Sequence, residues 1–463
     1  MTSSAKKNES LTSVHLFSIV STPFLITHAF SNSSCGGGAM AREKFDITNM
    51  KLEDHNHQEF IEYQGDDLFE VKNYFWEYLE DAISKKYYIY GNPLTTAPVP
   101  EVKAYDRYTD SVRHYLNFSS YNYLGYSVHP EVIEEVQKTL AKYGTGAVSA
   151  PLFSGYYDMT RTLEEAIADF KKKEAALVFP TGYSANLGVL SCLLKPGDVA
   201  VLDILSHASI YDGARLAGAD IKIFHHNSPR HLERVLKGLK TKRVIVCVEG
   251  VYSMDGDLAD LPRIVDICRK YGAKILLDEA HATLIFGENG RGVAEHFGVE
   301  DDIDITIGTF SKAFGAMGGF VAADRKLIRF LRVSARSYIF SCAMAPHTAA
   351  GILKILALYA NDKSRRIRLW ENTHYMHQAL TDAGMDIGET KSQVIPVMVG
   401  AEMRLWEIGR RIYEKGLLTG VVTYPAVSTK RTRLRLSVCA DHTKENMDAC
   451  VAILKEAFDE VPV

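Results

Sequence analysis

The chain has 463 residues, of which 46% are hydrophobic and 24% charged, values typical of a globular protein that can bury a large core. At roughly 100–200 residues per domain, two or three structural units are expected. The formal net charge of -4 argues against a nucleic-acid-binding surface, so no nucleic-acid partner is expected.

The first 40 residues are predicted to be a disordered, non-catalytic leader. Residues 14–30 are apolar, follow Lys6 and Lys7, and loosely resemble a signal peptide or a short membrane anchor. Polar residues and a proline interrupt this run, which is shorter than a membrane span of about 20 apolar residues. Membrane contact is therefore left open but is not indicated. The seven scattered cysteines lack C-x-x-C spacing, which favours reduced, buried thiols in a cytoplasmic protein.

Residues 41–114 are predicted to form an N-terminal arm with a helix over 71–86, before three prolines interrupt regular structure. From residue 115 short apolar runs alternate with amphipathic stretches. The expected strands are 175–179, 199–202, 221–224, 244–248, 275–277 and 303–307, and the expected helices include 163–172, 232–239 and 261–271. Such alternation predicts βαβ units and a mostly parallel sheet. The run Lys171-Lys172-Lys173 is predicted to be a solvated helix face.

We therefore expect an α/β fold with a large domain over 115–345, in which helices cover both faces of the sheet. A long helix over 348–360 is expected to open a smaller C-terminal α+β domain, residues 346–463.

Two residues at predicted strand ends suggest chemistry, because ligands bind at the carboxyl ends of parallel strands. Asp278 ends the strand in KILLDEAH, and a buried carboxylate needs a partner such as the protonated pyridine nitrogen of pyridoxal phosphate (PLP). A helix cap or a structural salt bridge would explain this aspartate equally well. Lys312, in GTFSKAFGAMGG, follows the next strand and suits a Schiff base with an aldehyde. An ordinary loop lysine is the alternative for Lys312.

Further candidates surround these two. Thr181-Gly182-Tyr183 follows a strand and opens a helix, where backbone N–H groups bind anions. Thr309 and Ser311 could bind a phosphate. His207 and His281 could stack on a pyridine ring or bond its phenolic oxygen, although a lone histidine is more often structural. No metal site is expected, because clustered Cys/His patterns are missing.

Together these motifs resemble the α-oxoamine synthases, enzymes of the type I PLP-dependent transferase fold. The resemblance runs from about residue 70 to the end and rests on FSSYNYLGY, YGTG, TGYSANLG, SHASIYDGARLAG, VEGVYSMDGDLADLP, LLDEAHA, GTFSKAFGAMGG and RLRLSVCADHT. The chain looks most similar to the serine palmitoyltransferase branch. That branch implies a homodimer that uses PLP to condense an amino acid, best guess serine, with an acyl thioester, with loss of carbon dioxide.

The resemblance also implies roles for individual residues. Lys312 would be the Schiff-base lysine and would exchange protons at the substrate α-carbon, and Asp278 would pair with the pyridinium. His281 and Ser253 would contact the phenolic oxygen of the cofactor, and His207 would lie on its ring face. Tyr121 and Arg435 would bind the substrate. The cofactor phosphate would be bound by Thr181, Gly182, Tyr183, Thr309 and Ser311. A guanidinium fork such as that of Arg435 can bond both oxygens of the substrate carboxylate.

Three features depart from the family pattern. Ala150-Pro151 replaces a pair that usually ends in arginine, Thr160 stands where a histidine is common, and Tyr121 stands where many bacterial relatives carry asparagine. These changes leave the identity of the amino-acid substrate undetermined, so a synthase that uses glycine or alanine is an alternative. A type I aminotransferase and a catalytically silent subunit are two others, although Lys312 argues against the latter.

Overall fold

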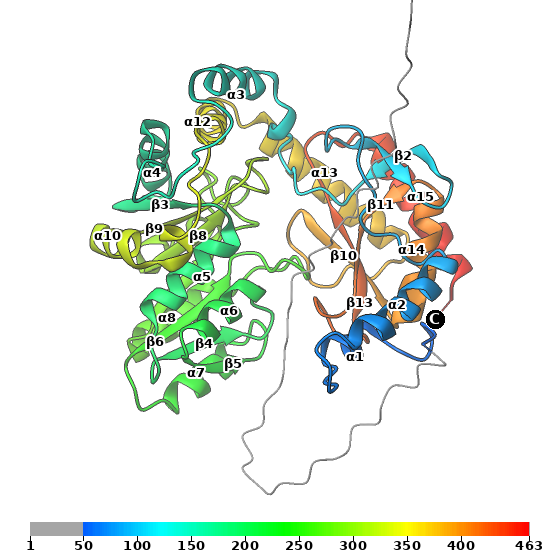
Figure 1. Ribbon diagram of the computed structural model, residues 1–463, viewed down its shortest axis with the longest axis horizontal. Helices are drawn as coiled ribbons and strands as arrows, with labels where there is room; N and C mark the ends of the chain where they lie inside the picture. Colours follow the sequence, from blue (N-terminus) through cyan, green and yellow to red (C-terminus); the bar gives the residue numbers. More distant parts are fainter. Residues whose placement is uncertain (1–49, 463) are drawn as a thin grey trace, which may run out of the picture.

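The computed structural model describes residues 50–462 (Figure 1), so the predicted leader, residues 1–40, lies outside the described residues. Within the described chain, no helix combines the length and the apolar character that a membrane crossing requires. Six of the seven cysteines fall in this range and all six are free thiols; five are buried as expected, but Cys342 is exposed. The cytoplasmic location stays a prediction.

A seven-stranded sheet forms the centre of the larger unit, with the order β3-β9-β8-β7-β6-β4-β5. Its strands are β3 (Ala175–Phe179), β4 (Val199–Asp203), β5 (Asp220–Phe224), β6 (Val244–Glu249), β7 (Lys274–Asp278), β8 (Ile305–Thr309) and β9 (Gly319–Ala323). The neighbours from β8 to β5 pair in parallel, whereas β9 is antiparallel to both β3 and β8. The six predicted strands and the mostly parallel sheet are confirmed, while β9 was not predicted.

Successive residues of each strand pack into two different cores, because side chains alternate between the faces of a sheet. In β6, Val246 and Val248 belong to one core, and Ile245 and Cys247 to the other. Both faces are therefore covered, which explains why the inner strands β4, β6 and β8 are buried at every position. One core includes α4 (Asp158–Phe170) and α8 (Leu261–Tyr271), and the other α5 (Gly182–Leu193), α6 (Ala208–Leu216) and α10 (Arg325–Ser334). The remaining short helices of this unit are η2 (Tyr126–Val128), α7 (Pro229–Lys237), α9 (Val293–His296), η3 (Glu300–Asp302) and α11 (Arg336–Ile339).

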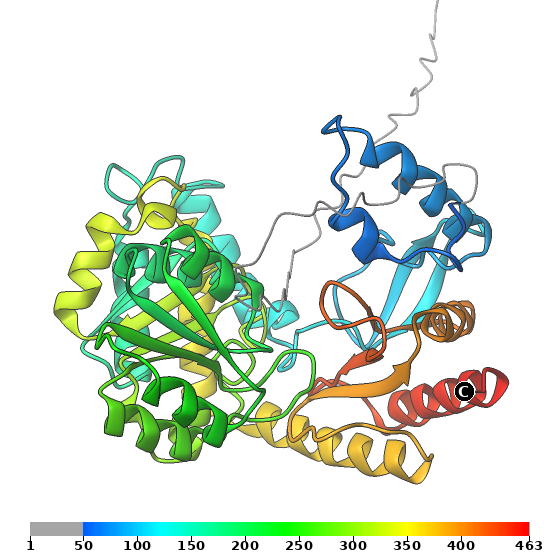
Figure 2. The ribbon, with the colours of Figure 1, turned by 90° about the horizontal axis from the view of Figure 1, so that it is seen from below.

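The smaller unit contains two three-stranded sheets. One is antiparallel and has the order β10-β13-β12, formed by β10 (Val394–Gly400), β12 (Gly420–Val422) and β13 (Thr432–Ser437). The other joins β1 (Glu101–Asp106) and β2 (Ser111–Asn117) to β11 (Leu417–Leu418). The N-terminal arm, including α1 (His57–Ile61) and α2 (Val71–Ser84), thus lies with the C-terminal residues (Figure 2).

The predicted helix near residue 350 is α12 (Pro346–Asn361), and it packs against α3 (Pro130–Tyr143) and α4 of the larger unit. The helices of the smaller unit are α13 (Ser364–Asp382), α14 (Glu402–Glu414) and α15 (Lys444–Glu460). The domain boundaries at 114/115 and 345/346 stay predictions.

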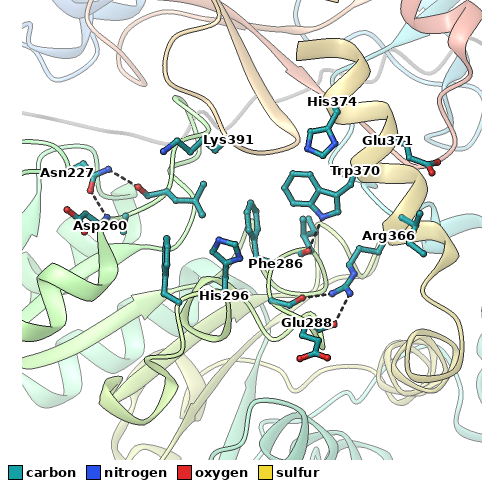
Figure 3. A pocket seen from close by; sticks show the side chains of 16 residues that line it. Asn227, Asp260, Phe286, Glu288, His296, Arg366, Trp370, Glu371, His374 and Lys391 are labelled. Atoms are coloured by element: carbon teal, nitrogen blue, oxygen red, sulfur yellow. Dashed lines mark hydrogen bonds between the residues drawn. The ribbon is translucent and has the colours of Figure 1, made fainter. Parts of the chain in front are cut away.

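Helix α13 contacts the loop that follows β7 across a crevice between the two units (Figure 3). Trp370 Nε1 donates a hydrogen bond to the carbonyl oxygen of Ile285 at 3.3 Å. Arg366 donates to the carbonyl oxygens of Gly287, at 2.6 Å, and Glu288, at 2.8 Å. These bonds fix the smaller unit against the loop after β7, the strand that ends in Asp278.

The prediction that the lysine run after α4 is solvated was wrong for its first member. Lys171 is buried, and its Nζ donates hydrogen bonds to Thr283 Oγ1 at 2.9 Å and to the carbonyl oxygen of Arg291. Burial lowers the pKa of Lys171 to about 8. Lys173 donates to two backbone carbonyls, and only Lys172 is exposed. The chain turns at the end of α4, so the run leaves the helix surface.

Candidate active site

The predicted site residues gather at one edge of the central sheet, because the strands that precede them run in the same direction. Because β9 is antiparallel to both β3 and β8, β3 runs in the same direction as β8. Asp278 ends β7, Thr309 ends β8, and Lys312 follows three residues later. His207 follows β4, Ser253 follows β6, and Thr181 follows β3.

The Asp278 carboxylate is buried and accepts two hydrogen bonds from neutral groups. Asn186 Nδ2 donates to its Oδ2 at 2.7 Å, and the backbone N–H of Ala280 donates to its Oδ1 at 2.9 Å. Asn186 also donates to Ser209 Oγ at 3.0 Å, and Ser209 Oγ lies 2.7 Å from His207 Nδ1. A buried carboxylate held by neutral donors favours a cationic ligand, and a protonated ring nitrogen has that chemistry.

Both histidines of the site are neutral at neutral pH. Burial lowers the pKa of His207, and the nearby Lys312 ammonium lowers it further. The pKa of His281 lies well below its usual range for the same two reasons. His281 Nδ1 lies 2.9 Å from the Tyr123 hydroxyl, and its carbonyl oxygen accepts a hydrogen bond from Gln393 at 3.0 Å. The Tyr123 contact thus orients the His281 ring, and the Gln393 bond holds its backbone.

Lys312 has an amine suited to nucleophilic attack near neutral pH. Burial lowers the pKa of its ammonium to about 8, against the opposing effect of the Asp278 and Glu249 carboxyls. The positive charge of Arg435 lowers this pKa further. An appreciable neutral fraction is what Schiff-base chemistry requires of a lysine.

The start of helix α5 lies against the ends of β8 and β9, where it can receive an anion. Thr181 caps the helix through a reciprocal pair with Ser184, at 2.9 Å and 3.0 Å. A Cβ at Gly182 would lie 3.1 Å from Thr309 Cβ, and one at Gly319 would lie 2.6 Å from Gly182 Cα, so this approach requires glycine.

Hydroxyl groups complete this cradle. Thr309 Oγ1 donates to the carbonyl oxygen of Gly318 at 2.9 Å and lies 2.8 Å from Ser311 Oγ. Tyr183 hydrogen-bonds Asp212 and presents its ring edge-on to His207, with the centroids 6.2 Å apart. Backbone N–H groups at a helix start together with hydroxyls suit a phosphate.

The predicted substrate-binding residues close the cluster from the smaller unit. Arg435, on β13, is buried and donates to the carbonyl oxygen of Ser253 at 3.0 Å. Its guanidinium lies 4.6 Å from the centroid of the Tyr121 ring, which in turn faces His281 edge-on at 6.2 Å. Tyr121 thus helps to hold Arg435 through a cation–π contact.

Sequence reasoning missed several residues of this network, among them Asn186, Tyr123 and Glu249. Asn186 is a polar residue on the buried face of an apolar helix, and that pattern could have indicated it. Glu249 ends β6 directly beside Asp278, and burial together with that neighbour holds the pKa of its carboxyl well above the usual range. Among the described residues its Oε1 has no hydrogen-bond partner.

Residues 113–454 match the protein family described as "Aminotransferase class I and II". The chain belongs to this family. The 8-amino-7-oxononanoate synthase of Thermoanaerobacter pseudethanolicus is 40% identical over 348 residues, which cover 75% of this chain and 87% of that protein. A solved structure of serine palmitoyltransferase from S. paucimobilis, with bound PLP–myriocin, matches with a TM-score of 0.81 and 32% identity, covering 85% of this chain and 99% of that one.

A longer relative is also similar. The 4-hydroxy-2,2'-bipyrrole-5-methanol synthase PigH of a Serratia species is 34% identical over 408 residues, which cover 88% of this chain but 62% of PigH. The resemblance to the α-oxoamine synthases and the type I PLP-dependent transferase fold, with a smaller C-terminal unit, are thus confirmed.

Proposed function

We propose that this chain is a PLP-dependent acyltransferase. It condenses an amino acid, proposed to be serine, with an acyl thioester carried by coenzyme A or a carrier protein, and the loss of carbon dioxide leaves an α-amino ketone. The observation that supports this most directly is the buried Lys312 amine, whose pKa lies near 8 and responds to the charge of the buried Asp278 carboxylate, within the fold of PLP-containing relatives. PLP, when bound, supplies an electron sink for charge at the substrate α-carbon.

The residues fit this cofactor in a defined orientation. Asp278 would keep the ring nitrogen protonated, and the start of α5 with Thr309 and Ser311 would hold the phosphate. His207 would lie against the ring, and His281 with Ser253 would lie beside the phenolic oxygen.

The remaining groups act on the substrate. Arg435 binds the carboxylate of the amino acid through its guanidinium fork. Lys312 removes the α-proton and later returns a proton to the same carbon, a role that a neutral amine near pH 8 can perform. Tyr121 covers Arg435 from the side and restricts the space for the amino-acid side chain.

A panel of amino acids tests the proposal. Holoenzyme incubated with serine, glycine or alanine should change its PLP absorbance with the productive amino acid. It should release carbon dioxide only when an acyl thioester is added, and mass spectrometry should identify the α-amino ketone. A pyridoxamine form produced by an amino acid alone would instead indicate an aminotransferase. No carbon dioxide with any acyl-CoA or acyl-carrier-protein donor would contradict the proposal.

We also propose a homodimer, because several large apolar side chains are exposed on the larger unit. Val148, Phe153, Phe340 and Met317 are 89%, 82%, 72% and 65% exposed. The segments that carry Val148 and Phe340 lie side by side, since Ala343 N–H donates to the carbonyl oxygen of Ser149 at 3.0 Å. Exposed apolar groups of this size mark association surfaces.

Sedimentation tests the dimer. Phe153→Asp should produce monomers at micromolar concentration, whereas Leu68→Asp, at an apolar residue 93% exposed on the arm, should leave the dimer intact. A wild-type protein that sediments as a monomer would contradict this proposal.

A further inference from the structure

A chamber of about 550 Å³ lies beside the candidate active site. Tyr121 and Arg435 of the site, together with Met254, form part of its wall. The N-terminal arm and the segment around β12 form most of the rest. Their principal side chains are His57, Phe75, Tyr78, Leu79, Trp406 and Val422. The arm lies beside this part of the smaller unit in both views of the chain (Figures 1 and 2).

Tyr90 makes two contacts that hold the arm against the opposite wall. Its hydroxyl donates to the carbonyl oxygen of Val421 at 3.0 Å, and its ring meets Trp406 edge-on at 6.0 Å. Within the arm itself, His57 stacks on Phe75 with the centroids 5.5 Å apart. Burial lowers the pKa of His57, so its ring is neutral at neutral pH. The chamber therefore has fixed walls that the arm and the C-terminal residues build together.

The lining matches an apolar occupant. Aromatic and aliphatic side chains dominate it, and its charged member, Arg435, stands at the side shared with the active site. In the proposed reaction Arg435 binds the amino-acid carboxylate, so the acyl carbon must approach from nearby and its tail needs room beyond. A pocket of several hundred Å³ with mainly apolar walls suits a small apolar ligand group.

We infer that this chamber holds the acyl group of the thioester as an extended aliphatic chain, and that helices α1 and α2 limit its length. The inference rests on the proposed function and assigns selection of the acyl group to Phe75, Tyr78 and Leu79. These residues precede the segment 113–454 that the family description matches. Selection of the acyl-chain length would therefore depend on the N-terminal arm, which lies outside the residues that match the family.

Straight-chain acyl-CoA thioesters of increasing length test this selection. For the wild type, kcat/KM should rise about fourfold per methylene until the chamber is full, and then fall. Leu79 is half-buried and lines the chamber, so Leu79→Trp should lower kcat/KM for the longest good substrate by about tenfold or more. The shortest substrate should change less than about threefold. Asn73→Trp, at an exposed position on the same helix, is the matched control and should leave the profile unchanged.

A binding measurement separates this inference from the proposed function. The chain has three tryptophans, and of these Trp406 lines the chamber. In holoenzyme carrying Trp76→Phe and Trp370→Phe, straight-chain acyl thioesters of N-acetylcysteamine should change Trp406 emission, with a dissociation constant that falls about fourfold per methylene.

The binding and activity measurements test the chamber and the proposed function separately. Length-dependent binding without carbon dioxide release from any acyl donor would support the chamber and overturn the proposed function. Carbon dioxide release whose kcat/KM is independent of acyl length and of Leu79→Trp would support the proposed function and overturn the chamber. Trp406 emission that does not respond to any thioester would also overturn the chamber.

Discussion

The acidity of Lys312 provides a quantitative test of the site in the absence of cofactor. With a pKa of about 8, about a quarter of the amine is neutral at pH 7.5, against about one in a thousand for an ordinary lysine. Burial is the main cause, and the neighbouring charges act in opposite directions: Asp278 and Glu249 raise the pKa, and Arg435 lowers it. Removing the charge of Asp278 or of Arg435 should therefore shift the titration in a known direction.

Competitive labelling of the apoenzyme with a small amine reagent measures this titration. The rate of modification of Lys312, quantified by mass spectrometry across pH, should have its midpoint near 8. Asp278→Asn should lower the midpoint, and Arg435→Met should raise it. Labelling of the exposed Lys172 in the same sample corrects for reagent hydrolysis. A midpoint of about 10, or shifts of the same sign in both variants, would refute the electrostatic account.

Three further predictions follow from single contacts. Asn186→Ala removes one of the two hydrogen bonds to the carboxylate proposed to hold the cofactor, so the apoenzyme should bind PLP about tenfold or more weakly in an absorbance titration. Arg435→Lys keeps the charge but loses the fork, so KM for the amino acid should rise about tenfold while KM for a short acyl thioester changes little. His226 lies 3.0 Å from Asp203 and 3.1 Å from Asp257; burial opposes its charge, but these carboxylates raise its pKa to about 10. The stabilising effect of the protonated His226 is complete below about pH 6.5 and is lost as pH rises toward 10. The free energy of unfolding, measured by chemical denaturation, should therefore be about 3 kcal/mol higher in the wild type than in His226→Gln at pH 6, and this difference should shrink as pH rises.

The sheet could be predicted because its strands are short apolar runs between amphipathic helices. Strand β6, for example, is buried at every position, which its sequence VIVCVE indicates directly. Strand β9 escaped prediction because GFVAA is short and follows a glycine-rich turn that masks its start. The position of the arm could not be predicted, because the pairing of β2 with β11 joins residues about 300 apart in the chain.

The site was predictable where a residue follows a strand, since parallel strands bring their ends together. Asp278, Lys312 and His207 were found in this way. Asn186 was not, because it lies inside a helix and acts through its bond to Asp278. Lys171 was misplaced because sequence alone does not show that the chain turns inward after α4, where backbone carbonyls receive the ammonium.

In the proposed site, Lys312 binds the cofactor aldehyde while Asp278 faces the ring nitrogen. Borohydride reduction of the holoenzyme, followed by peptide mass spectrometry, tests this arrangement. A pyridoxyl group on Lys312 in the wild type, with none on the protein in Lys312→Ala, is the predicted result. A label on another lysine, or no label on a protein that releases carbon dioxide with an amino acid and a thioester, would contradict the account.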